Sequence, residues 1–256
     1  MTEEKKLLDL SAYALSPSHF NKANLMLFYG PPKGGKTWLA ASAALAKGLG
    51  PVAILDTEGS SYGTMTEFEG QDIDIFDASN FDDFNTLFDG LMEHPHKYNT
   101  IVVDTFDSIQ EKALEQFKAE QEAIAAATHK EVNSFAQWGS LKAWSNHVAK
   151  ALRDSSALGI ILVHEKEEKS EETGKIISRL ALMGSAKDSV PGIPDLIGHA
   201  TRATGEDGKP VTTLRLGSYS EKFATGNRFE KRLPEIMVDP TIGKIMDIIT
   251  RKAVTK

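Results

Sequence analysis

A short apolar run that leads directly into a glycine-rich loop constrains this 256-residue chain more than any other feature. Residues 25–29 read Leu-Met-Leu-Phe-Tyr, which is typical of a fully buried strand. Residues 30–37 fit the pattern G-x-x-x-x-G-K-[ST], and an Ala- and Leu-rich stretch predicts a helix from Lys36 to about Lys47. A strand, this loop and a helix in that order predict a phosphate-binding loop.

Such a loop surrounds a phosphate with backbone N–H groups and the positive end of a helix. Lys36 is expected to reach the β- and γ-phosphates of ATP, and the Thr37 hydroxyl to coordinate Mg²⁺. Lys33 is interpreted as an exposed loop lysine rather than a second catalytic lysine. The residues expected to contact the nucleotide are Gly30, Pro31, Pro32, Lys33, Gly34, Gly35, Lys36, Thr37 and Trp38.

Apolar strands and helices alternate along the next part of the chain. Strands are predicted at 52–56, 73–76, 101–104 and 158–163, and a helix at 81–92. This alternation predicts an α/β fold with a mostly parallel central sheet and helices on both faces. Farther on, extended runs at 199–203 and 211–216 flank a turn with Gly and Pro, which predicts an antiparallel hairpin near the C-terminus.

Composition limits the classes of function. Hydrophobic residues make up 41% and charged residues 25%, as in folded globular proteins. With no cysteine, disulfides and thiolate metal sites are excluded, so any metal must have oxygen ligands. The chain has no apolar run of about 20 residues and no signal-peptide pattern, so we expect a cytoplasmic protein without a membrane partner. We expect a short N-terminal segment, 1–23, followed by one core domain, 24–256.

The net charge of −7 argues against a protein that coats nucleic acid. Acidic residues crowd the ranges 54–93 and 165–172. A locally basic surface stays open in the last third of the chain. Its basic residues include Lys175, Arg179, Lys187, Arg202, Lys222, Arg228, Lys231 and Arg232.

Two carboxylates follow predicted strands. Asp104 ends the run 101–103 and is expected to hold Mg²⁺, with a helix-capping aspartate as the alternative. The next residue is Thr105 rather than Glu, so the base that orients the attacking water must come from elsewhere. Glu58 follows strand 52–56 and would face the γ-phosphate across the cleft. The alternative for Glu58 is a solvent-facing acid in a turn.

The order of these features resembles the core of the RecA-type recombinases. It is most similar to the phage RecA-like single-strand annealing ATPases, which consist of little more than that core. The resemblance spans about residues 25–235 and rests on the pieces 28–37, 54–59, 102–105, 138–139 and 162–165. It implies a DNA-stimulated ATPase that binds single-stranded DNA and promotes annealing or strand pairing.

The resemblance also implies roles for single residues. Glu58 would be the catalytic carboxylate and His164 the γ-phosphate sensor, where recombinases usually have an amide. A histidine would make that role pH-dependent, and a structural histidine is the alternative. Residues 165–184 correspond to the second DNA-binding loop, although their many glutamates also suit a solvated loop without a ligand. Its candidate phosphate contacts are Lys166, Lys169, Lys175 and Arg179.

The first DNA-binding loop would lie near 130–137 and include Lys130. Trp138 and Trp144 suggest base stacking, but with Leu141, Val148 and Leu152 they follow helical spacing, which favours a core role. The segment 118–128 is interpreted as a charged surface helix or a mobile crossing.

Assembly is expected from the same resemblance. Arg228, or else Lys222, would reach the γ-phosphate of a neighbouring subunit, so that ATP lies at the interfaces of a homo-oligomer. The segment with Leu7, Leu8 and Leu10 would be an arm that joins subunits or a helix packed on its own core. A single-strand-binding protein is a candidate partner, and a phage source would place the chain in the host cytoplasm.

Other functions remain open at this point. Many small-molecule kinases share the phosphate loop, but they usually have an arginine-bearing lid, and the first arginine here is Arg153. A nucleotide-gated loader or regulatory ATPase would bind ATP with little turnover. A replicative helicase is also conceivable, but such helicases commonly carry a separate N-terminal domain, for which we expect no room here.

Overall fold

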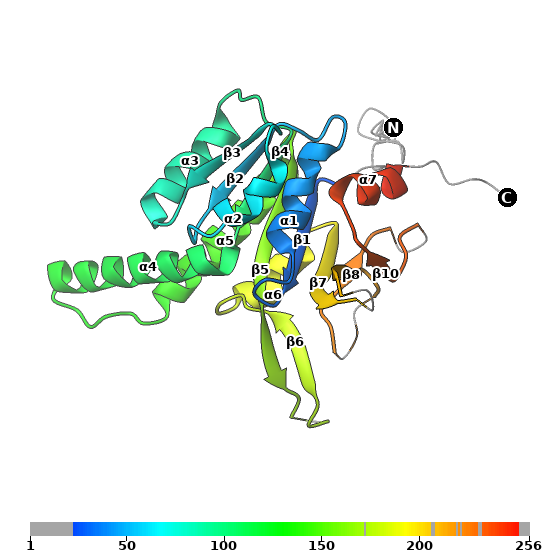
Figure 1. The fold of residues 1–256 in the computed structure, drawn as a ribbon. Helices are drawn as coiled ribbons and strands as arrows, with labels where there is room; N and C mark the ends of the chain where they lie inside the picture. The colour runs from blue at the N-terminus through cyan, green and yellow to red at the C-terminus, as the bar shows by residue number, and fades with distance from the viewer. Residues whose placement is uncertain are drawn as a thin grey trace, which may run out of the picture.

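The computed structural model describes residues 23–250 except 172, 206, 207, 219, 221, 230 and 231. The expected N-terminal arm with Leu7, Leu8 and Leu10 lies outside the described residues, as do Glu172 and Lys231. In the described part, a central sheet has helices packed on both faces (Figure 1). No helix in that part is long and apolar enough to cross a membrane.

The centre of the sheet is parallel, in the order β7-β1-β5-β4-β2-β3. Every residue of β1, β2 and β4 is buried, which explains their continuous apolar sequences. The predicted α/β fold with a mostly parallel sheet is confirmed. These strands are β1 (Leu25–Gly30), β2 (Val52–Asp56), β3 (Ile73–Asp77), β4 (Thr100–Asp104), β5 (Leu158–Lys169) and β7 (Leu196–Thr204).

Alternate residues of β1 enter two separate apolar layers. Leu25, Leu27 and Tyr29 pack on the face covered by α3, α4, α5 and α6. Met26 and Phe28 pack on the opposite face, against α1 and α7. The helices are α1 (Lys36–Ala41), α2 (Tyr62–Met65), α3 (Phe81–Glu93), α4 (Phe106–Thr128), α5 (Ala136–Asp154), α6 (Ala186–Ser189) and α7 (Ile242–Thr250).

Helix α1 is shorter than the sequence predicts. The α-helix ends at Ala41, and a 3₁₀ turn continues over Ser42–Leu45. The buried Ser42 hydroxyl donates to Leu39 O (2.5 Å) and accepts from the backbone N–H of Ile242 (2.9 Å). A serine that bonds to backbone in this way competes with the α-helical pattern. The same contact anchors α7, which the sequence did not predict.

The predicted C-terminal hairpin is confirmed. Strand β8 (Pro210–Arg215) pairs antiparallel with β7, and β10 (Ile236–Val238) pairs antiparallel with β8. The short strand β9 (Gly226–Asn227) pairs with the start of β7.

Two features project from this core (Figure 1). Helix α4 extends well beyond the sheet, so the charged segment 118–128 is a surface helix as one interpretation held. Strand β5 continues past the sheet and pairs antiparallel with β6 (Ile176–Leu180). The segment expected to be a DNA-binding loop is therefore largely a β-hairpin. Backbone hydrogen bonds between the two strands give this segment its regular structure. The charged sequence of the segment does not reveal that pairing.

Candidate nucleotide-binding site

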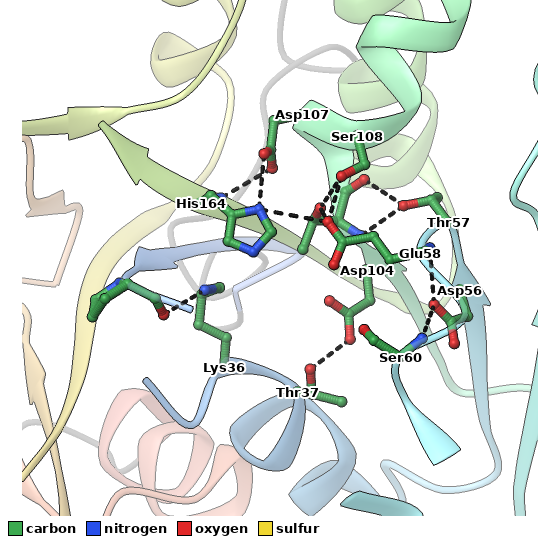
Figure 2. Close-up of polar contacts among 12 residues, drawn as sticks. Lys36, Thr37, Asp56, Thr57, Glu58, Ser60, Asp104, Asp107, Ser108 and His164 are labelled. Carbon is green, nitrogen blue, oxygen red and sulfur yellow. Dashed lines mark hydrogen bonds and ion pairs between the residues drawn. The ribbon is translucent and has the colours of Figure 1, made fainter. Parts of the chain in front are cut away.

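Four predicted site residues meet at the carboxyl ends of the parallel strands (Figure 2). Lys36 follows β1, Glu58 follows β2, Asp104 ends β4 and His164 lies in β5. In open α/β sheets, ligands bind outside this edge of the sheet.

The phosphate loop has little room for side chains. A β-carbon on Gly30 would lie 2.0 Å from Ala200 O, because β1 and β7 run side by side there. Gly35 has a φ of 87°, in the left-handed region that favours glycine. The loop closes with a hydrogen bond from Gly34 N–H to Pro31 O (3.0 Å). Lys33 is exposed at the tip of the loop, as expected.

Lys36 is buried under this loop, with 6% of its surface exposed. Its ammonium donates to Gly30 O (2.9 Å) and Pro31 O (3.0 Å), which are neutral acceptors. Burial lowers the pKa of Lys36, and the charge of Asp104 opposes that shift. A phosphate would supply the negative charge that carbonyl oxygens lack, so the surroundings of Lys36 fit the predicted ATP.

Asp104 and Thr37 form an oxygen pair suited to Mg²⁺. The Thr37 hydroxyl donates to Asp104 Oδ2 over 2.7 Å. Burial, together with the charges of Asp56 and Glu58, raises the pKa of Asp104 to about 6. A divalent cation would favour the ionised carboxylate. Mg²⁺ at nucleotide sites commonly keeps several waters and phosphate oxygens as ligands, so Thr37 and Asp104 would suffice as its protein ligands.

The turn that carries Glu58 is held by Asp56. One Asp56 oxygen accepts from the backbone N–H groups of Glu58 (3.1 Å) and Gly59 (2.9 Å). Thr57 joins this turn to the end of β4: its N–H donates to Asp104 O (2.8 Å) and its hydroxyl to Thr105 O (2.8 Å). These bonds set the position of Glu58 relative to Asp104.

The Glu58 carboxylate takes part in a polar cluster, although the residue itself is exposed in a turn. It accepts from the hydroxyls of Thr105 (2.8 Å) and Ser108. Its Oε1 lies 3.6 Å from Nδ1 of His164. The cluster joins the end of β2, the start of α4 and β5, and Figure 2 shows these groups converging.

His164 is oriented by Asp107, in the first turn of α4. One Asp107 oxygen accepts from the backbone N–H of His164 (3.0 Å), and the other lies 2.9 Å from Nδ1. The hydrogen bond to Asp107 raises the pKa of His164, although burial opposes it. Asp107, Thr105 and Ser108 were not predicted as site residues. An acid in the first turn of a helix is common for dipole reasons, so the sequence alone gave no signal that Asp107 contacts a residue on β5.

The tryptophans have mainly structural contacts. Trp38, expected at the nucleotide, donates to Glu67 (2.8 Å) and lies against Phe68. Trp144 packs against Phe106 and donates to Asn85 (2.9 Å), which confirms its core role. Trp138 is 37% exposed and lies beside Gly184, so the core role favoured for it by helical spacing is wrong.

The candidate DNA contacts do not all lie together. Lys166 and Arg179 face each other across the β5–β6 hairpin and line one groove. The alternation of a strand puts Lys169 on the opposite face of the hairpin, and Lys175 follows its turn. Helix α4 extends away from the hairpin (Figure 1), and Lys130 is bonded to the C-terminal turn of that helix through its N–H to Ala125 O.

Arg228 lies at the other end of the sheet from its own phosphate loop. It pairs with Asp195 (3.1 Å), which accepts from the N–H of Asn24 just before β1 (2.8 Å). Its predicted role is toward a neighbouring subunit, and that stays a prediction.

Two solved structures are similar to this chain over most of its length. No curated protein matches the chain in sequence. Among solved structures, the RadB recombinase is 19% identical with a TM-score of 0.48, covering 85% of this chain and 87% of that one. The flagellar accessory protein FlaH from Methanocaldococcus jannaschii is 12% identical with a TM-score of 0.44, covering 87% and 88%.

A family profile described as an AAA domain matches residues 22–229. That range holds the phosphate loop and all three of the other converging residues, Glu58, Asp104 and His164. Because the match covers most of the chain and its whole nucleotide site, the protein belongs to this AAA domain family of P-loop ATPases.

Proposed function

We propose that this ATPase binds single-stranded DNA and promotes annealing or strand pairing. ATP binding and hydrolysis would control its affinity for the DNA. The observation that carries the proposal is strand β5. It runs without a break from the buried sheet, through His164, into the exposed hairpin. A change at the γ-phosphate side of the site can thus reach the hairpin through one continuous strand.

The hairpin borders a groove suited to an extended polyanion. The groove has a volume of about 1140 Å³. Lys166, Arg179 and Lys187 line it together with the partly exposed ring of Trp138. Cations that follow a phosphate backbone beside an aromatic ring are typical of single-strand binding. Glu168 and Asp188 also line the groove and would favour modest affinity at physiological salt.

Assembly into a homo-oligomer belongs to the same proposal. The side chain of Arg228 is 58% exposed and pairs with Asp195 at the start of β1, the end of the strand opposite its own phosphate loop, which supports a role toward another subunit. Lys222, the alternative cation, lies over the ring of Phe223 beside the hairpin. ATP between subunits would make hydrolysis depend on assembly.

The test measures ATP hydrolysis with and without single-stranded DNA at two salt concentrations, with Lys36→Ala as the blank. We expect DNA to stimulate turnover, and the stimulation to fade as salt rises. The double variant Lys166→Ala/Arg179→Ala should weaken DNA binding and lower the salt slope by roughly 1.4, about 0.7 for each lost phosphate contact on a single strand.

The matched control is Lys112→Ala/Lys118→Ala, which removes the same charge from exposed positions on α4. It should leave binding nearly unchanged. Equal losses of DNA binding in both double variants would show that net charge, and not the groove, determines that binding. A rate of ATP hydrolysis that is the same with and without DNA at both salt concentrations would contradict the proposal. It would favour a nucleotide-gated module or a kinase.

A further inference from the structure

We propose that Asp107 is a positioning residue for ATP hydrolysis, which holds His164 as a cationic γ-phosphate sensor in place of an uncharged one. The inference rests on the proposed ATPase activity of this site. It assigns a role to a residue of α4 that the sequence did not indicate as a site residue.

The contacts of Asp107 fix both the backbone and the ring of His164. One carboxylate oxygen accepts from the N–H of His164 (3.0 Å) and the other lies 2.9 Å from ring Nδ1. An ionised carboxylate accepts and cannot donate, so Nδ1 carries the proton. Figure 2 shows the second ring nitrogen, Nε2, pointing away from Asp107 toward the side where Lys36 and Asp104 lie.

The charges around His164 come from three other elements. Asp107 on α4 and Glu58 after β2 favour the imidazolium, with Glu58 Oε1 3.6 Å from Nδ1. Lys36 on α1 opposes it. Asp107 is mostly buried, with 14% of its side chain exposed, so solvent screens its pairing with His164 only weakly. The net direction is a raised His164 pKa, with the Asp107 hydrogen bond as the largest cause.

A doubly protonated ring has a donor on each nitrogen. Nδ1–H keeps its hydrogen bond to Asp107. Nε2–H of the positively charged ring can then donate to a phosphate oxygen. Such charge-assisted bonds are about twice as strong as neutral ones. As the pH rises through the His164 pKa, the ring becomes neutral and this contribution to turnover falls.

The experiment compares Asp107→Asn, His164→Gln and the double variant in the full-length protein, across pH. Asparagine keeps an acceptor but loses the charge. We expect Asp107→Asn to lower kcat about 10–100-fold, as for other residues that orient a functional group, and to move the alkaline fall of kcat to lower pH. His164→Gln should remove that fall, and adding Asp107→Asn to it should cost little more.

A direct titration of the His164 ring by NMR gives a readout independent of turnover, with its signal assigned from His164→Gln. The pKa should lie above the ordinary value in the wild type and drop in Asp107→Asn. Asp82→Asn is the control, because Asp82 is an exposed aspartate at the same position of α3 and follows a phenylalanine as Asp107 does.

Two results would overturn the inference. One is an unchanged ring titration in Asp107→Asn. The other is a loss of kcat on adding Asp107→Asn that is as large in the His164→Gln variant as in the wild type. Failure of the proposed activity is recognised separately, because Lys36→Ala and Glu58→Gln would then hydrolyse ATP as fast as the wild type.

Discussion

At the scale of single residues, the candidate site depends on neighbouring side chains that hold the predicted site residues in place. Glu58 is held by the hydroxyls of Thr105 and Ser108, and His164 by Asp107. A carboxylate can orient a water only if it is held in place itself, since small errors of position reduce catalysis strongly. These partners therefore determine whether two predicted residues can act.

Glu58→Gln is the most direct test of the catalytic carboxylate. We expect kcat to fall about 10²–10⁴-fold, because an amide cannot accept a proton from water, while ATP affinity changes little. Steady-state kinetics and calorimetric ATP titration measure the two effects. Glu115→Gln on the exposed face of α4 is the control. Full turnover in Glu58→Gln would remove Glu58 from the mechanism.

His199 gives a stability prediction with a definite sign. It is buried, lies 4.8 Å from the rings of Tyr29 and Phe223, and contacts Glu165 (2.7 Å). Burial lowers the pKa of His199, and Glu165 only partly opposes this. Its neutral form therefore supports the fold above the unfolded pKa of about 6.5, and that support is lost as the pH falls through the folded pKa.

Urea unfolding between pH 7.5 and about pH 5 tests this. The wild type should lose more stability on acidification than His199→Gln, which keeps a donor for Glu165. The exposed His147 gives the control His147→Gln, which should follow the wild type. Parallel curves for the wild type and His199→Gln would contradict the prediction. The pKa of His164 is raised, so its contribution to the pH dependence of stability has the opposite sign. Because the wild type, His199→Gln and His147→Gln all contain His164, this contribution cancels in the comparison.

At the scale of elements, the phosphate loop depends on its neighbouring strand as well as on its own sequence. Gly30 and Gly34 both lie against the backbone of Ala200 in β7. Gly35 lies against Thr212 in β8. The C-terminal hairpin thus forms one wall of the loop, and β5 links the same site to the β5–β6 hairpin.

Gly30→Ala should destabilise the protein by more than about 3 kcal/mol, because the new β-carbon would lie 2.0 Å from Ala200 O and backbone cannot easily move aside. Gly63→Ala in α2 is the matched control. Its β-carbon meets nothing within 4 Å, and alanine should stabilise a helix slightly. Urea unfolding measures both, and equal stabilities would show that β1 and β7 can separate at no cost.

At the scale of the whole molecule, the two ends of the sheet carry different groups. The nucleotide site lies at the carboxyl ends of the strands, while Arg228 lies near the start of β1 and β7 with Asp195. One chain therefore offers a site and a distant cation on opposite sides. Head-to-tail contact between such surfaces generates rings or filaments.

Mixing two inactive variants tests whether Arg228 acts in trans. Arg228→Ala and Glu58→Gln should each be inactive alone. In an equal mixture, about a quarter of head-to-tail interfaces would combine an intact Glu58 with an intact Arg228, so activity should return to roughly that fraction. No recovery would exclude Arg228, and recovery with Lys222→Ala instead would assign the role to Lys222.

The sequence alone predicted the phosphate loop, the mostly parallel α/β fold and the strands at the parallel centre of its sheet. These follow from local patterns: a glycine-rich loop between a strand and a helix, and apolar runs of strand length. For the same reason Asp104 and Glu58 could be predicted as site residues, since Asp104 ends an apolar strand and Glu58 follows one.

Only the tertiary structure decided which distant side chains meet. Asp107 contacts His164 across 57 positions of sequence, and Thr105 reaches Glu58 across 47. It also separated Lys166 and Arg179 from Lys169 and Lys130, because strand pairing and the length of α4 set their places. Such contacts depend on sheet order and register, which arise from packing of the whole chain and leave no local pattern in the sequence.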